Sequence, residues 1–228
     1  MKPSILLLLF WNCYICVFAQ NNTTSELDSL YREDQIYIGV TYNALKDLPN
    51  GVSQNSFSTG VHLGVIRDFP INKRRNLAIG VGLGYSFNNF NQNIKISKST
   101  PTTYTILEGI GYSKNNFSQH LLEIPFEFRW RTSNSETYKF WRIYSGIKLS
   151  YGIWEQSYFR GPEGSARISN WSVIESSQLF YTLSFGYGTF NAQLQYGLRS
   201  FFPESTEKTS GASIGATPIK LGMVFYLL

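Results

Sequence analysis

The sequence has almost no cysteine, and this scarcity excludes disulfide-rich proteins and proteins with thiolate metal sites. Its 228 residues include two cysteines, Cys13 and Cys16, and both lie near the start of the chain. Their C-x-x-C spacing also occurs in zinc and redox sites. Here the pair lies inside an apolar run, so we interpret it as hydrophobic filler. The rest of the chain therefore has neither a disulfide framework nor thiolate metal ligands.

Charge is also scarce, and it is not clustered. Charged residues make up 15% of the chain, below the ~25% of an average soluble domain. The formal net charge is +5, yet the only basic cluster is Lys73-Arg74-Arg75, in a predicted tight turn. Nucleic-acid binding needs a basic patch or stripe, so we reject it. The cluster is either a solvated turn or a turn that faces acidic lipid headgroups.

After residue 20 the chain lacks any apolar run long enough for a membrane-spanning helix. The longest apolar stretch, residues 4–18, is short for a spanning helix; it follows Lys2 and leads into Val17-Phe18-Ala19, the pattern of a signal peptide. We predict a signal peptide over residues 1–19 and a periplasmic segment over residues 20–34. An uncleaved anchor is the alternative. Without spanning helices, the mature chain can cross lipid only as a closed β-barrel.

What the sequence does have is aromatic residues, 16% of the total, and apolar residues that alternate with small or polar ones. Alternation with a period of two is typical of strands with one apolar face. It predicts an all-β fold, an eight-stranded antiparallel transmembrane outer-membrane β-barrel over residues 35–228. A soluble β-sandwich with an aromatic core is the alternative, but long strands with continuous apolar faces favour the barrel. The predicted strands are 35–43, 57–67, 76–88, 118–131, 138–154, 178–187, 190–199 and 218–228.

The connections between these strands alternate between long and short. Residues 44–56, 89–117, 155–177 and 200–217 form the long ones, and residues 68–75, 132–137 and 188–189 the short ones. Outer-membrane barrels have long extracellular loops and short periplasmic turns. One question stays open in the longest loop. Residues 94–96 and 104–110 form either a hairpin above the membrane or two further barrel strands.

The inward positions of these strands carry glycines and charges of both signs. An eight-stranded barrel has an interior that side chains can just fill. Buried charges are tolerated when they are paired, and Glu123 and Glu127 can reach Arg142 and Lys148 on the next strand. We therefore predict an ion-pair plug and no open pore. The predicted plug consists of Glu123, Glu127, Arg129, Arg142, Lys148, Arg199 and Lys220.

Nothing in the sequence favours catalysis. Glu123 and Glu127 share one strand face, as a general acid–base pair would, but the abundant inward basic residues favour the plug. A hydrolase would need a histidine beside a serine or aspartate, and only Ser118 and His120 approach this pattern. The second histidine, His62, lies far away in the sequence. We expect no catalytic residue, no metal, no cofactor and no small-molecule substrate.

Five stretches of the mature chain carry a family resemblance: 34–43 (DQIYIGVTYN), 51–54 (GVSQ), 62–76 (HLGVIRDFPINKRRN), 120–132 (HLLEIPFEFRWRT) and 138–146 (YKFWRIYSG). They resemble the PorT (SprT) proteins of Bacteroidota, and the similarity spans nearly the whole mature chain. The stretch EIPFEFRWR, residues 123–131, is shared with the wider outer-membrane barrel superfamily. The resemblance implies an outer-membrane barrel needed for type IX protein secretion and, where present, gliding motility. It carries over no site residues.

Three functions follow in order of preference. The first is an accessory barrel of the secretion system, with outer-membrane lipid and other envelope proteins as partners. Its contacts would be the loops or the short turns at residues 72–75 and 132–136. The second is a generic barrel for envelope integrity or adhesion, acting through its long surface loops. The third is a small barrel enzyme that acts on lipid or peptide.

Overall fold

The computed structural model describes residues 34–54, 56–97, 103–107, 111–132, 140–162, 164–169, 174–203, 207–208 and 214–227. The chain divides into two units, Met1–Tyr31 and Arg32–Leu228. The predicted signal peptide and most of the predicted periplasmic segment lie outside the described residues. Within the described ranges, no helix is long and apolar enough to span a membrane.

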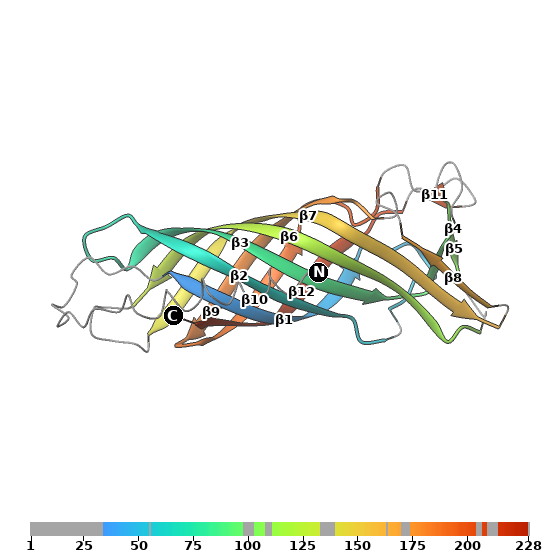
Figure 1. Cartoon of the computed structure of the whole chain (residues 1–228), viewed down its shortest axis with the longest axis horizontal. Helices are drawn as coiled ribbons and strands as arrows, with labels where there is room; N and C mark the ends of the chain where they lie inside the picture. Colours follow the sequence, from blue (N-terminus) through green and yellow to red (C-terminus); the bar gives the residue numbers. More distant parts are fainter. Residues whose placement is uncertain are drawn as a thin grey trace, which may run out of the picture. The chain divides into compact units, whose positions relative to one another are not determined.

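Eight antiparallel strands form a closed barrel, as the sequence predicted. The sheet follows the chain around the barrel axis and closes where β1 pairs with β12, with Ile36 opposite Leu227 (Figure 1). The barrel strands are β1 (Gln35–Lys46), β2 (Thr59–Pro70), β3 (Leu77–Asn91), β6 (Lys114–Arg131), β7 (Trp141–Gly161), β9 (Ser177–Tyr187), β10 (Phe190–Gly197) and β12 (Thr217–Leu227).

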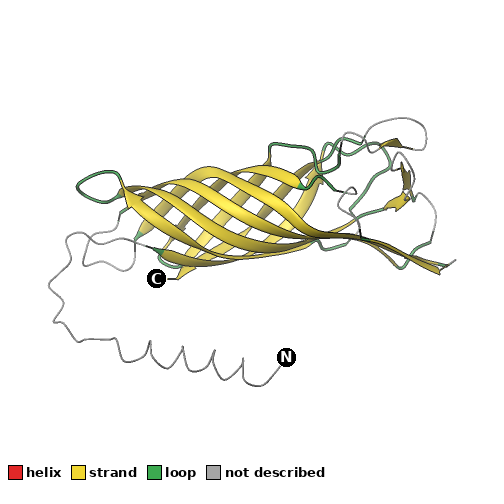
Figure 2. Cartoon of the chain, turned by 45° about the horizontal axis from the view of Figure 1, so that its top comes forward, coloured by secondary structure: helices red, strands yellow, loops and turns green. Residues whose placement is uncertain are grey.

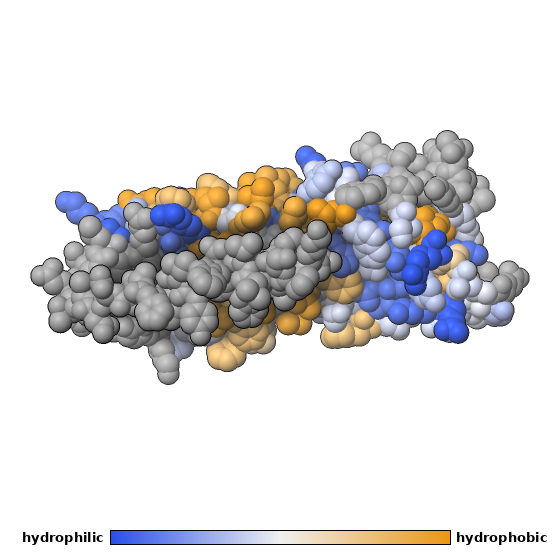
Figure 3. All heavy atoms as spheres, viewed as in Figure 1, coloured by the Kyte–Doolittle hydropathy of each residue, from blue (hydrophilic) through white to orange (hydrophobic). Residues whose placement is uncertain are grey.

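Alternation along each strand decides which side chains face out. In β2 the outward Leu63 and Val65 are 49% and 55% exposed, whereas the inward His62 and Ile66 are 1% and 3% exposed. Successive side chains of a strand point to opposite faces, so the closed sheet has an apolar outer surface and a mainly polar interior. Hydrophobic residues accordingly gather over the barrel strands in the space-filling view (Figure 3).

Five strands run several residues further than the sequence predicted, among them β1 to Lys46 and β2 to Pro70. β3 continues to Asn91, β6 begins at Lys114 and β7 continues to Gly161, so parts of the predicted loops 89–117 and 155–177 are strand. The pairing extends to Asn91 opposite Asn116 and to Lys114 opposite Arg160. These stretches carry polar side chains on the outward face, which read as loop in the sequence. Only the hydrogen-bonded ladder shows that they are strand.

A β-bulge lies in β7 just before its extended part. His120 pairs with Trp154 and Leu121 with Gly152, so Ile153 is the extra residue of the pair. A bulge of this kind shifts the alternation by one position. Beyond it, Trp154 faces out and Glu155 is buried inside. Because of this shift, the alternation read from the sequence predicts a strand end at residue 154, although β7 continues to Gly161.

The long connections carry structure of their own at one end of the barrel. β4 (Ile94–Ser97) pairs antiparallel with β5 (Thr103–Ile106), and β5 pairs parallel with β11 (Glu207–Lys208). They form a separate three-stranded sheet, so β4 and β5 pair outside the barrel and are not extra barrel strands. Residues 108–110 of the predicted segment 104–110 lie outside the described residues. β8 (Gly164–Ile168) turns back on β7 as a second hairpin (Figure 2). By the loop-length rule, we expect this end to face outward from the cell.

Candidate functional site

The barrel interior holds a cluster of charges near the short-turn end. Asp68 of β2 binds two arginines of β6, with one carboxylate oxygen on Arg129 and the other on Arg131. Arg129 also donates to Gln35 Oε1 at 2.5 Å, and its Nε lies 3.3 Å from Glu127 Oε2. All five side chains are buried. Since a carboxylate can accept two parallel N–H bonds, one aspartate here joins two strands.

A second charged cluster lies deeper, around Glu123 of β6. Lys148 Nζ is 3.0 Å from Glu123 Oε2, and Ser86 Oγ donates to Glu123 Oε1 at 2.8 Å. His62 Nδ1 is 3.2 Å from the same Oε1. An ionised carboxylate accepts about four hydrogen bonds, and these three neighbours occupy most of that capacity. The cluster ties β2, β3, β6 and β7 together through one buried group.

The structure brings six of the seven predicted plug residues into the interior. Glu123, Glu127, Arg129, Arg142, Lys148 and Lys220 are all buried there. Arg142 lies with its guanidinium carbon 4.3 Å from the centre of the Phe140 ring and donates to the Gly188 carbonyl in the β9–β10 turn. Lys220 Nζ is 4.5 Å from the centre of the Phe180 ring.

The prediction for Arg199 was wrong. β10 ends at Gly197, so Arg199 follows the strand and does not share its alternation. The side chain is exposed at the long-loop end and donates to Ser177 Oγ at 3.2 Å. Strand ends are set by where pairing stops, and the sequence carries no clear marker of that point here.

Sequence reasoning missed Asp68, Arg131 and His62 as members of the charged interior. Asp68 was assigned to a turn because β2 was expected to end at Arg67. His62, Gly64 and Ile66 share its parity, so continuing the alternation through Asp68 would have placed it inside. Arg131 likewise follows Arg129 by two positions. The signal was present for both: Asp68 needed the correct end of β2, whereas Arg131 already lay at the end of the predicted strand 118–131.

One trio inside the barrel has the order of a catalytic triad. Thr41 Oγ1 is 3.2 Å from His62 Nε2, and His62 Nδ1 is 3.2 Å from Glu123. These are a hydroxyl, a base and an orienting carboxylate. Thr41 has a single hydroxyl proton, and Asn43 Oδ1 accepts it at 2.8 Å. The three side chains are 2%, 1% and 0% exposed, so no substrate reaches them, and we interpret the trio as part of the interior packing.

His120 lies on the outer wall and not at a hydrolytic centre. Its Nδ1 shares a hydrogen bond with Tyr85 Oη, and its ring contacts Phe87 and Trp154 at centroid distances of 5.0 and 4.9 Å. Ser118 lies two positions along the same outward face. Among the described residues, no group of three or more His, Cys, Asp or Glu side chains is placed to hold a metal ion.

An apolar cluster closes the long-loop end of the barrel. Phe90 and Phe117 belong to barrel strands, whereas Phe201 and Phe202 come from the loop after β10. The Phe90 and Phe201 ring centroids are 4.6 Å apart, and those of Phe117 and Phe202 are 5.6 Å apart. The loop is also tied by its backbone, since Phe201 N donates to the Ala216 carbonyl at 2.7 Å. The loops thus fold over the mouth of the barrel as a small core.

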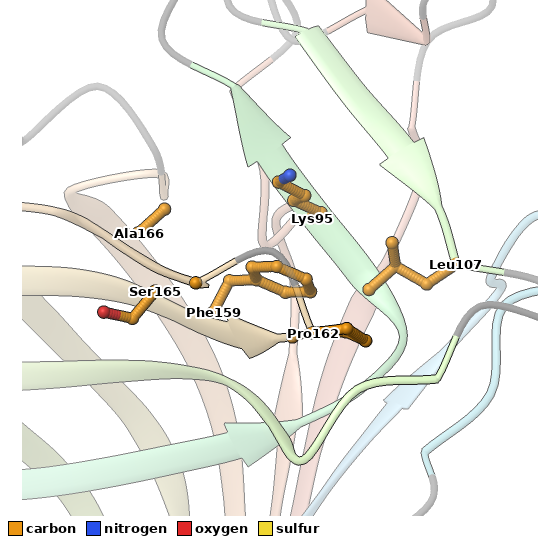
Figure 4. A pocket seen from close by; sticks show the side chains of 8 residues that line it. Lys95, Leu107, Phe159, Pro162, Ser165 and Ala166 are labelled. Atoms are coloured by element: carbon orange, nitrogen blue, oxygen red, sulfur yellow. The ribbon is translucent and has the colours of Figure 1, made fainter.

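Beside this cluster lies a pocket of about 370 Å³ between β4 and the β7–β8 hairpin. Phe159 and Lys95 point toward one another in it (Figure 4), with Lys95 Nζ 4.5 Å from the centre of the ring. Its other walls are Leu107, Pro162 and small residues, among them Ser165 and Ala166. A cation on an aromatic face beside small residues forms a shallow site open to the outside.

The chain was compared with known proteins. A family model described as "Outer membrane protein beta-barrel domain" matches residues 18–203. Two crystal structures of Ail, the attachment invasion locus protein of Yersinia pestis, resemble the chain, one of them in complex with the heparin analogue sucrose octasulfate. Sequence identities are 12% and 13% and TM-scores 0.39 and 0.40, and each match covers 87% of this chain and 100% of the other. No curated protein matches the chain.

Proposed function

Because the chain belongs to the family of outer membrane protein beta-barrel domains, we propose that it is a non-enzymatic barrel that acts by binding other envelope proteins. As a member of this family it is an outer-membrane protein. The finer proposal is a role in type IX protein secretion, and in gliding motility where that exists. It is supported by the resemblance to PorT proteins described above. Export would depend on removal of residues 1–19.

The observation that carries the proposal is the filled interior. Asp68, Arg129 and Glu123 are fully buried among neighbouring side chains, and Phe201 and Phe202 lie over the mouth. Small barrels of this size are packed inside, unlike the wide barrels that hold aqueous channels. A barrel with no open channel offers only its outer surfaces for function. We therefore propose that it conducts no solute and acts by contacting other envelope proteins.

The β2–β3 turn is the periplasmic contact that we propose. Lys73 and Arg74 are exposed there, and the turn that carries them is tightly held. Asn72 Nδ2 donates to Asn76 Oδ1 at 2.6 Å, and Leu77 N donates to Asn72 Oδ1 at 3.2 Å. A rigid turn presents its two cations with little loss of entropy on binding. It would suit an acidic surface on a partner. The other turn named above, residues 132–136, lies outside the described residues apart from Thr132.

The test is export of type IX cargo by a strain that lacks the gene. We expect the deletion to abolish export and the wild-type gene to restore it. The variant K73E/R74E should restore it poorly, because charge reversal opposes an acidic partner. K46E/R199E is the matched control, since it reverses one exposed lysine and one exposed arginine at the opposite end. Normal export in the deletion strain would refute the proposed role in type IX secretion.

A second function, adhesion through the surface loops, is favoured by one observation. The outer loops form a sheet, an apolar cluster and the Lys95–Phe159 pocket. Ordered loops with a pocket suit ligand binding at the cell surface. If the deletion strain exports cargo normally but cells lose attachment to a surface, and K95A reproduces that loss, this function replaces the first.

A further inference from the structure

The outward face of β3, β6 and β7 carries an aromatic cleft at the height where the apolar surface ends. Tyr85, His120, Ile153 and Trp154 line a hollow of about 300 Å³. The bulge makes room for it, because Ile153 and Trp154 together oppose His120. Aromatic side chains with a polar edge favour the membrane interface. The cleft therefore opens toward the lipid at the outer boundary of the apolar zone.

A larger polar groove of about 690 Å³ continues the same face away from the membrane. Phe87 joins the two, since it lines the groove and its ring centroid is 5.0 Å from that of His120 in the cleft. Lys114 and Arg167 both lie over the Tyr158 ring, at 5.8 and 5.5 Å from its centre. The groove thus begins at aromatic rings and ends among cations. Its polar walls include Asn116, Ser118, Gln156 and Arg160.

The cations of this groove stand close together, and no described carboxylate pairs with them. Lys114 and Arg160 are directly opposite each other on β6 and β7, and Arg167 is opposite Tyr158 on β8. Like charges opposite each other across two strands are destabilising. In the described part of the chain, no carboxylate lies within ion-pair distance of these three side chains. An anionic ligand would remove the repulsion.

The distance of these cations from the apolar zone indicates which kind of anion they would bind. Lys114 is six positions beyond His120 on β6. At a rise of ~3.3 Å per residue and a tilt of ~40°, that places it about 15 Å beyond the aromatic cleft. A phospholipid headgroup layer is only about 5–8 Å thick. The cations therefore lie beyond simple phospholipid headgroups, at a height that a lipid with a sugar headgroup reaches.

We propose that this face of β6, β7 and β8 binds a phosphorylated glycolipid of the outer leaflet. Lys114, Arg160 and Arg167 hold its phosphates, and an acyl chain lies in the cleft beside Trp154. The side-chain amides and hydroxyl of Asn116, Gln156 and Ser118 suit the hydroxyl groups of a sugar. This site is independent of the proposed role in secretion, which concerns protein contacts at the opposite end of the barrel.

The experiment measures binding of rough-type lipopolysaccharide to the purified full-length barrel in detergent, by native mass spectrometry. We expect K114Q/R160Q to lower its affinity roughly thirtyfold, as for two cations near an anionic lipid surface. K46Q/R199Q is the matched control, because it removes one exposed lysine and one exposed arginine at the same end but away from the groove. It should bind like the wild type. Unchanged far-UV circular dichroism shows that both variants are folded.

Two further ligands test whether the bound phosphate belongs to a glycolipid, to a phospholipid or to free phosphate. Phosphatidylglycerol should bind the wild type more weakly than lipopolysaccharide, and inorganic phosphate should not displace lipopolysaccharide. W154A should weaken binding of intact lipopolysaccharide but not of its deacylated oligosaccharide. Equal weakening by the two double variants would overturn the proposal. So would equal binding of phosphatidylglycerol and lipopolysaccharide by the wild type.

Discussion

Single charged residues inside the barrel depend on one another. Glu123 touches Lys148, Ser86 and His62, and each of the four is buried. Taking a charge out of water is costly, and only a close partner of opposite sign offsets that cost. Removing the charge of Glu123 would therefore destabilise the barrel mainly because it would leave Lys148 buried without its carboxylate partner.

We expect E123Q to lower the free energy of unfolding of the barrel by about 3–5 kcal/mol, the usual effect of breaking a buried pair. Urea unfolding in lipid vesicles measures it. D47N is the control, because Asp47 pairs with Lys46 at 3.8 Å at the surface, where both side chains are more than half exposed. Its effect should stay below about 1 kcal/mol. Equal stability of E123Q and the wild type would show that the interior does not depend on this pair.

Glycine at position 84 leaves room for one tyrosine ring. A side chain at Gly84 would collide with Tyr37 Oη, and one at Gly64 would come within 2.7 Å of Tyr37 Cε1. We expect G84A to cost about 1–3 kcal/mol of unfolding free energy, as for other overpacked sites. In a Y37F background the cost should fall, because the colliding oxygen is gone. An identical cost in both backgrounds would place the strain elsewhere.

At the scale of the strand, the bulge in β7 is the feature that alternation does not anticipate. Ile153 is the extra residue, with Gly152 inside and Trp154 outside. Deleting Ile153 would join Gly152, which faces inward, directly to Trp154, which faces outward. The regular alternation of the strand would then be restored. Removing any paired residue instead would turn every later side chain to the wrong face.

We therefore expect deletion of Ile153 to leave a folded barrel and deletion of Leu149 to prevent folding. Leu149 is the control because it lies in the same strand, paired with Ile124 and Leu179. Insertion into vesicles, followed by resistance to protease, distinguishes the two outcomes. If both deletions fold equally well, side-chain alternation does not fix the register of β7.

At the scale of the whole molecule, two kinds of packing close the barrel. Charged clusters around Asp68 and Glu123 fill the interior, and the Phe90, Phe117, Phe201 and Phe202 rings cover the outer mouth. The two closures differ in chemistry, and the aromatic one adds Phe201 and Phe202 of the loop after β10 to barrel-strand residues. Loss of one therefore leaves the other in place.

We expect the purified barrel to give no stable conductance steps in a planar lipid bilayer. F201G/F202G should also give none, because the ion pairs of the interior remain. An open porin in the same bilayer is the positive control. Discrete conductance steps from the wild-type barrel would contradict the closed interior and the proposed contact function together.

The sequence by itself determined the fold, because a period of two is a local property that any single strand displays. The alternation in eight segments, the alternating long and short connections and the lack of a spanning helix after residue 20 predict a closed antiparallel barrel and the side of the sheet on which Glu123, Glu127 and Lys148 lie. Family membership and the closed sheet bear out that prediction.

Only the tertiary structure decided where strands end and which charges meet. Arg199 falls outside the barrel because pairing stops at Gly197, and Asp68 falls inside because β2 continues past Arg67. The loop core at Phe201 and the groove beside Lys114 likewise join residues that are far apart in the chain. The physical reason is that hydrogen-bond ladders and packing are made between segments, and no single segment carries a record of its partner.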